Sequence, residues 1–181
     1  AVTMQQMVVD RVRAAIEGAD WDGALALLDE SDDADRDPAL LELRAQAAYG
    51  AGDFEGCVSA WEARHALLRD AGDRAGAAHA AAMVAMFLVI DAGLMSLVRG
   101  WLRRAEQFLE AEEGPTDAVI AAVRGYERFF CGDLETARAQ SDRAVVLGGR
   151  FGVLAAEVIG RTARARLTIV AGRVDEGLEQ L

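Results

Sequence analysis

Apolar residues recur along this chain with the spacing of one face of an α-helix. A small residue and then a large apolar residue open a segment, and further apolar side chains follow four and seven positions later, as Leu25 and Leu28 follow Trp21. This spacing places the apolar side chains on one side of a helix. Segments of this kind open at Trp21, Phe54, Leu94, Leu134 and Val174. Another amphipathic or apolar segment precedes each of them, in the ranges 3–17, 38–50, 74–91, 116–131 and 151–170. The pattern predicts ten helices in five antiparallel pairs.

The segment that opens at Leu134 departs from this pattern. Arg138 and Ser141 occupy its two later positions, so we expect its apolar face to run through Ala137, Ala144 and Val145 instead. Boundary signals elsewhere agree with the helical pattern. They are Asp37-Pro38 at a helix start, and Gly114-Pro115 and Gly148-Gly149 at helix ends.

The same short turn joins the two segments of each predicted pair. It lies in the strings GADWDGALALL (18–28), AGDFEGCVSAW (51–61), AGLMSLVRGWL (92–102), CGDLETARAQS (131–141) and AGRVDEGLEQL (171–181). Its small residues are 33, 41, 39 and 40 positions apart by subtraction, and they are Ala19, Gly52, Gly93, Gly132 and Gly172. A phosphate-binding loop would need free amides without carboxylates nearby, whereas Asp53 and Glu55 follow Gly52. We therefore interpret glycine here as the residue that permits a tight turn between helices.

Stacking of the helix pairs is the expected way to form a core. An isolated pair cannot bury both of its apolar faces, but neighbouring pairs in an array can. We therefore predict an all-α fold, an α-solenoid of about five antiparallel helix pairs that spans residues 1–181 as one repeat domain. The stripe Val174, Leu178 and Leu181 should pack on something further. That partner would be another helix, a downstream domain, or a second copy that forms a homodimer through the C-terminal helix.

Composition and charge argue against binding to nucleic acid or insertion into a membrane. All 19 basic residues are arginine, and 30 acidic residues bring the net charge to −11. Such a surface repels phosphates, so we expect this segment to bind no nucleic acid. No window of 18 residues is purely apolar, so no membrane-spanning helix is expected. Because the first residues lack the pattern of a secretory signal, the expected location is the cytoplasm.

One acidic stretch has part of a calcium-binding pattern. Asp33, Asp35 and Asp37 have the alternate spacing of an EF-hand loop. However, Pro38 stands where glycine is required and Arg44 stands where a bidentate glutamate is required. We therefore interpret this stretch as a solvated loop between helices, in which Asp37 caps the next helix.

The histidines and cysteines do not form a recognisable site in the sequence. His65 and His79 have no Cys, His or carboxylate at metal-ligand spacing. Cys57 and Cys131 lie far apart, each at a helical position, so we predict two buried thiols rather than a disulfide. No serine has the flanking glycines of a nucleophile elbow. We expect no metal, no cofactor and no enzymatic activity.

The unit LLELRAQAAYGAGDFEGCVSAWEARHALL (40–68) resembles a tetratricopeptide repeat. The glycine, acidic residue and aromatic residue of its turn match that family, and so does the small residue Cys57 three positions later. Longer strings are similar to the repeat region of LuxR-type transcriptional regulators from actinobacteria. They are HALLRDAGDRAGAAHAAAMVAMFLVIDAGLMSLVRGWLRRAEQFLE (65–110), VRGYERFFCGDLETARAQSDRAVVLGGRFG (123–152) and LTIVAGRVDEGLEQL (167–181).

This resemblance implies a non-enzymatic regulatory domain in a bacterial transcriptional regulator. Such a domain would bind a protein segment or a small effector, or associate with itself, and pass its state to a DNA-binding domain beyond residue 181. Further C-terminal repeats and that output domain would then be missing from this chain. Two alternatives stay open: a stand-alone scaffold or adaptor protein, and a repeat segment attached to an enzyme such as a nucleotide cyclase.

The first helices of stacked tetratricopeptide pairs line a concave surface that binds ligands. Projected onto this chain, that surface contains Glu42, Gln46, Tyr49, Met83, Phe87, Ile90, Ala122, Tyr126, Phe129, Thr162 and Arg166. The candidate groove residues among them are Tyr49, Met83, Phe87, Tyr126, Phe129 and Arg166. Their rings and guanidinium suit a peptide or a small apolar-acidic ligand. The alternative for Met83, Phe87 and Phe129 is ordinary core between repeats. Arg166 could also form an anion patch with Arg161 and Arg164, unless these arginines pair with acidic neighbours.

Overall fold

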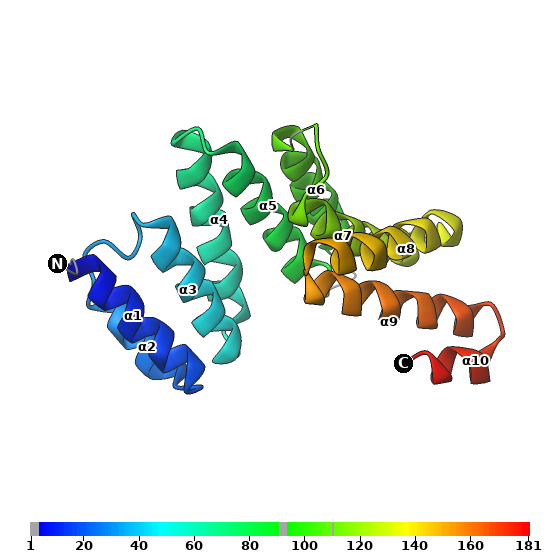
Figure 1. Ribbon diagram of the computed structural model, residues 1–181, viewed down its shortest axis with the longest axis horizontal. Helices are drawn as coiled ribbons and strands as arrows, with labels where there is room; N and C mark the ends of the chain where they lie inside the picture. The colour runs from blue at the N-terminus through cyan, green and yellow to red at the C-terminus, as the bar shows by residue number, and fades with distance from the viewer. Residues whose placement is uncertain (1–3, 91–93, 110) are drawn as a thin grey trace. The chain divides into compact units, whose positions relative to one another are not determined.

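The computed structural model describes residues 4–90, 94–109 and 111–181, and within them the chain forms ten α-helices and no β-strand. In chain order they are α1 (Met4–Glu17), α2 (Trp21–Asp29), α3 (Pro38–Gly50), α4 (Phe54–Asp70), α5 (Arg74–Leu88), α6 (Met95–Phe108), α7 (Pro115–Phe130), α8 (Leu134–Phe151), α9 (Leu154–Val170) and α10 (Val174–Glu179) (Figure 1). The prediction of an all-helical chain with neighbouring helices packed in pairs is confirmed. Four helices, α2, α4, α8 and α10, begin at the residue that the apolar pattern predicts.

The chain divides into two compact units, Ala1–Ala80 and Ala81–Leu181. In the first unit α1 packs on α2, α2 on α3, and α3 on α4. Their apolar faces meet in a core of buried side chains from α1, α2 and α3, namely Val9, Val12, Ala24, Leu28, Leu40, Leu43 and Ala47. Asp37 caps α3, because its carboxylate accepts the Ala39 amide at 2.8 Å and Pro38 begins the helix.

In the second unit α7, α8 and α9 pack on one another, and α10 packs on α9. Small side chains allow the three longer helices to approach closely, and the buried core they form is Ala118, Ala121, Ala122, Ala144, Leu147 and Ala156. The face expected for the segment after Leu134 is present, since Ala137 and Ala144 are buried and Val145 is half-buried. Ser141 is buried on the same face and satisfies its hydroxyl by donating to the Ala137 carbonyl at 2.7 Å.

A short turn with one left-handed residue joins consecutive helices at six places in the described chain. Between α7 and α8, the Gly132 amide donates to the Phe129 carbonyl (3.1 Å) and the Asp133 amide donates to the Arg128 carbonyl (3.0 Å). The Asp133 carboxylate then accepts the Thr136 amide at 3.1 Å and caps α8, so one residue ends a helix and begins the next. The left-handed residues and their φ angles are Ala19 (56°), Gly52 (79°), Gly72 (78°), Gly132 (81°), Gly152 (69°) and Gly172 (85°).

Two of these turns were not predicted from the sequence, and one predicted boundary is wrong. The turns at Gly72 and Gly152 connect one helix pair to the next, so the same device works within pairs and between them. Helix α8 does not end at Gly148-Gly149 but continues to Phe151. Gly148 serves close packing instead, because a Cβ there would lie 2.7 Å from the backbone nitrogen of Glu157. Gly93, a further predicted turn residue, lies outside the described residues.

A membrane-spanning helix would need a long, almost uncharged apolar stretch. None of the helices in the described ranges has one.

Candidate functional site

Equivalent positions of consecutive helix pairs meet where α7 packs on α9. Tyr126 and Arg166 are 40 residues apart (166 − 126), which is also the separation of the turn glycines Gly132 and Gly172 (172 − 132). The structure brings the two side chains together: the Arg166 guanidinium carbon lies 5.5 Å from the centroid of the Tyr126 ring. At that distance the cation is attracted to the electron-rich face of the ring. The repeat therefore holds Arg166 in a defined place.

Two further rings extend this surface along α7. The Phe130 ring centroid lies 6.2 Å from that of Tyr126 and 5.8 Å from that of Phe129, with the two phenylalanine rings close to perpendicular at 73°. Phe130 is exposed, whereas Tyr126 and Phe129 are half-buried. Burial raises the pKa of the Tyr126 hydroxyl, and the nearby Arg166 cation lowers it to a smaller extent. We call Tyr126, Phe129, Phe130 and Arg166 the α7–α9 face.

The arginines of α9 differ in their partners. Arg161 forms an ion pair with Glu157, and Arg164 with Asp142 at 3.0 Å. For Arg166, which is exposed, no carboxylate partner occurs among the residues that the structure describes. Two of the three members of the possible anion patch are thus already paired, and Arg166 has only the contact with Tyr126. It is the cation on this surface that can accept a carboxylate from outside.

The other candidate groove residues have different positions. Tyr49 is exposed near the C-terminal end of α3, in the first unit. Met83 and Phe87 are half-buried on α5, in the second unit. The residues that the described contacts join directly are therefore Tyr126 with Arg166, while Phe129 is joined to Tyr126 through Phe130.

A buried carboxylate next to this face was not predicted. Glu127 is fully buried, and its Oε1 accepts a hydrogen bond from Arg99 Nη1 of α6 at 3.1 Å. Arg128 Nε lies 3.1 Å from the other carboxylate oxygen, and the Cys131 thiol donates to Oε1 at 3.5 Å. A signal existed, because Glu127 follows the buried Val119 and Val123 at steps of four. Its position on the buried stripe makes it a structural ion pair between α6 and α7.

The two thiols have different surroundings. Cys57 is buried, and burial together with the nearby Asp53 raises its pKa to about 11. Cys131 is exposed, so the prediction of a buried thiol is wrong at that position. The reason is that Cys131 lies one residue beyond the end of α7, on the turn rather than on the helix.

The histidines of the first unit have structural contacts. A ring nitrogen of His65, Nδ1, lies 2.8 Å from the Ala77 carbonyl oxygen. The His79 ring meets the Trp61 ring edge-on at 5.8 Å, and burial lowers the His79 pKa, with a smaller lowering from Arg64. Over the described part of the chain, no group of three or more Cys, His, Asp or Glu residues could hold a metal ion.

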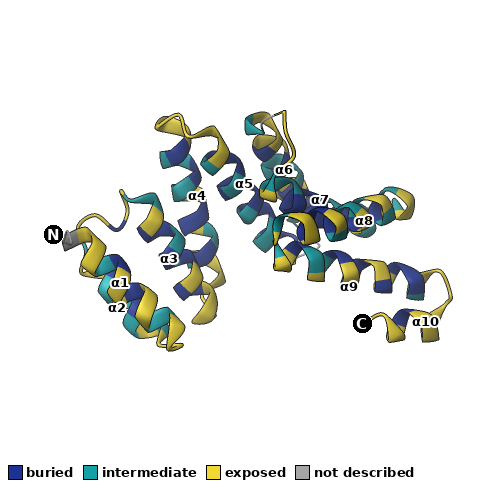
Figure 2. Cartoon of the chain, in the orientation of Figure 1, coloured by how far each residue is buried: buried dark blue, intermediate teal, exposed yellow. Residues whose placement is uncertain are grey.

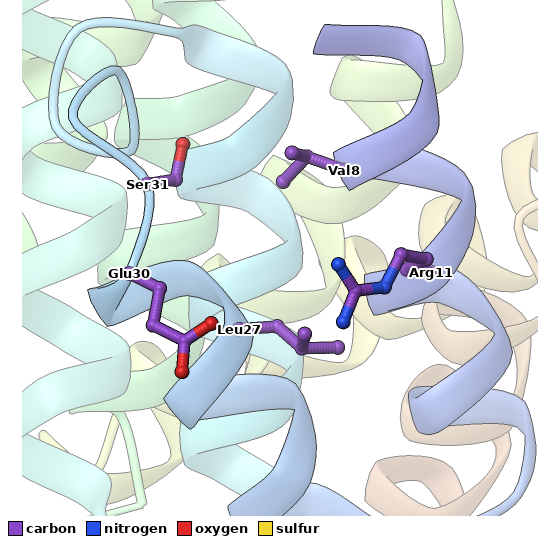
Figure 3. A pocket seen from close by; sticks show the side chains of 5 residues that line it. All are labelled: Val8, Arg11, Leu27, Glu30 and Ser31. Carbon is purple, nitrogen blue, oxygen red and sulfur yellow. The ribbon is translucent and has the colours of Figure 1, made fainter. Parts of the chain in front are cut away.

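A hollow in the first unit is too small to be a convincing ligand site. Val8 and Arg11 of α1 and Leu27 and Glu30 of α2 line it together with Ser31 (Figure 3). It holds about 120 Å³, whereas small-molecule sites usually hold about 300 Å³ or more and are lined mainly by apolar and aromatic groups. The α7–α9 face remains the stronger candidate.

No protein-family model, curated protein or solved structure matches this chain. What the α7–α9 face can bind follows from its own side chains. A guanidinium can donate two parallel hydrogen bonds to a carboxylate, and the adjacent exposed ring offers apolar contact. No nucleophile or acid–base pair takes part in this surface, so its chemistry is that of binding.

Proposed function

We propose that this chain is a non-enzymatic interaction domain of the tetratricopeptide-like, α-solenoid type, and that its α7–α9 face binds a protein segment. The segment would present a carboxylate to Arg166 and an apolar side chain to Phe130. The observation that carries the proposal is Arg166 itself: it is exposed, held over Tyr126 at 5.5 Å, and free of any carboxylate partner among the described residues.

The energetics favour an outside partner for this arginine. A hydrogen bond to a charged group contributes about 1.5–3 kcal/mol when it is well formed. Ordering a long side chain on binding usually costs part of that gain, about 0.5–1.5 kcal/mol. The contact with Tyr126 already restricts Arg166 before binding, so less of the gain is lost.

The wider role rests on the resemblance of residues 65–110, 123–152 and 167–181 to LuxR-type regulators. In that role, occupation of the α7–α9 face by a protein segment or a small effector would be the signal that the domain passes to its output domain. The protein would act in the bacterial cytoplasm. The binding proposal does not depend on this role.

Selection from a displayed library of random peptides, about twelve residues long, tests the binding proposal. We expect the selected peptides to share an aspartate, a glutamate or a free C-terminal carboxylate next to a large apolar residue. Replacement of both Tyr126 and Arg166 by alanine should abolish recovery of these peptides. Peptides without a carboxylate, or equal recovery on the double variant, would contradict the proposal.

A further inference from the structure

The N-terminal half of α9 lacks the covering helix that its C-terminal half has. Helix α9 has 17 residues, whereas α10 has 6. Figure 1 shows α10 folding back beneath the end of α9, with the C terminus below the middle of that helix. The contact is made at Gly177, where an added Cβ would lie 2.4 Å from Ile169 Cγ1 and 2.8 Å from the Ala165 carbonyl oxygen. Leu154 and Val158, in the half of α9 that α10 does not reach, are 70% and 51% exposed.

The preceding helix pair shows what covers the equivalent place. Because Gly132 and Gly172 occupy the same turn 40 residues apart, Val158 corresponds to Ala118 of α7 (158 − 40). Ala118 is fully buried in a cluster that includes Ala144 and Leu147 of α8. Those two covering residues lie 12 and 15 positions after Gly132 (144 − 132 and 147 − 132). A helix therefore covers this place in the α7–α8 pair.

Helix α10 cannot cover Val158 in the same way. Its last residue, Glu179, lies only 7 positions after Gly172 (179 − 172). Meanwhile α10 exposes apolar side chains of its own: Figure 2 shows this helix exposed over nearly all its surface, and Val174, Leu178 and Leu181 are all exposed. One surface thus holds both an open seat for an apolar helix and a short helix with an uncovered apolar stripe.

We propose that two copies of this chain associate through this surface, the α9–α10 face, defined by Leu154, Val158, Leu178 and Leu181. A two-fold axis would place Leu178 and Leu181 of each copy against Leu154 and Val158 of the other. Such an isologous contact satisfies both features at once, because each copy supplies the helix that the other needs. The α9–α10 face shares no residue with the α7–α9 face, so the inference does not rest on the proposed function.

Charge favours a second copy of this unit as the partner. Residues 81–181 contain 12 arginines and 14 acidic residues, a net charge of −2, whereas residues 1–80 contain 7 arginines and 16 acidic residues, a net charge of −9. Two second units can therefore approach with little repulsion. The helices of the face also carry both signs, since Arg161 and Arg173 alternate with acidic side chains such as Glu176. A self-complementary pairing is compatible with that mixture.

Sedimentation velocity of the 181-residue chain tests the proposal. The chain should shift from monomer to dimer between about 5 µM and about 500 µM, a range that brackets a micromolar dissociation constant. Val158→Glu should weaken association at least tenfold. The matched control is Val146→Glu, because Val146 is a 67% exposed valine on α8 of the same unit. It should dimerise like the parent chain.

Two results would overturn the proposal. A monomer at every concentration would show that a second copy does not cover the face, whether water or a helix of another protein does. Equal dimerisation of Val158→Glu and Val146→Glu would place the contact on another surface. Circular dichroism guards against a trivial loss of fold, and Leu154→Glu provides a second variant on the same exposed half of α9.

Discussion

Alanine at the turn glycine Gly132 should destabilise the second unit through its backbone alone. Gly132 has a φ of 81°, and an added Cβ would have no neighbour within 4 Å, so no clash contributes. An L-residue in the left-handed region costs about 1–2 kcal/mol, while the reduced freedom of the unfolded chain returns about 0.4–1 kcal/mol. We expect the free energy of unfolding to fall by about 1 kcal/mol, the difference between these two effects.

The same substitution at Gly149 should have the opposite sign. Gly149 lies inside α8, is exposed, and also has no atom within 4 Å of an added Cβ. Alanine is more favourable than glycine in a helix by about 1 kcal/mol, so Gly149→Ala should stabilise the unit by up to that amount. Ala19 provides a reverse test in the first unit, because it has a φ of 56° without being glycine. Ala19→Gly should relieve strain there and stabilise that unit.

Urea unfolding followed by circular dichroism measures these differences. The variants Gly132→Ala and Gly149→Ala should differ by about 2 kcal/mol, roughly a thirtyfold difference in the unfolding equilibrium constant. Both lie in the second unit, so the comparison stays valid if the two units unfold separately. If both substitutions shift the midpoint in the same direction, the assignment of glycine to backbone geometry is refuted.

Three further predictions concern charged and titrating groups. Because burial lowers the folded-state pKa of His79, protonation favours the unfolded chain, so stability should fall as the pH drops from about 7.5 to about 5.5, across the usual histidine pKa of about 6.5. Urea unfolding at both pH values should show a smaller loss for His79→Phe. Arg99→Ala should lower the free energy of unfolding by about 1–3 kcal/mol, because it leaves the buried Glu127 carboxylate with fewer partners. Adding Glu127→Gln should restore part of that loss, and a purely additive double variant would contradict the ion pair. Finally, Arg166→Gln should raise the Tyr126 pKa further, since the cation lowers it now. Absorbance titration checks this in a chain whose other tyrosine is replaced by phenylalanine, and an unchanged pKa would remove the stacked contact.

The helices and most of their starts could be predicted from local sequence. Apolar spacing and capping aspartates are both local signals, which is why α4 begins directly after Asp53 and α8 directly after Asp133. The turn at Gly72 was missed although its string, AGD at 71–73, is identical to that at 51–53. The pattern was sought only at the repeat spacing, and Gly72 lies between pairs rather than within one.

Other features depend on contacts between helices that are distant in sequence. Two adjacent glycines, Gly148 and Gly149, look like a helix end, but Gly148 stays helical because the backbone of α9 approaches it too closely for a side chain. The burial of Glu127 depends on Arg99, which is 28 residues earlier on another helix. Local propensity contains no information about either contact.

The candidate site was predictable in part for the same reason. Tyr126 and Arg166 share a position in consecutive repeats, so the repeat spacing alone suggests that they are neighbours, and the ring–guanidinium contact follows. Phe130 was passed over because its neighbour Phe129 fits the projected position better, yet Phe130 is the more exposed ring. Exposure near a helix end depends on how the next turn leaves the helix, which the sequence pattern does not specify.

The affinity of one selected carboxylate-bearing peptide for the chain tests the central claim most directly. Fluorescence anisotropy would compare the parent chain with Arg166→Gln and with Arg161→Gln, a control on the same helix whose arginine is already paired with Glu157. We predict at least a tenfold loss for Arg166→Gln, the equivalent of about 1.4 kcal/mol, and little change for Arg161→Gln. Equal affinities for all three proteins would contradict the assignment of the α7–α9 face as the binding surface.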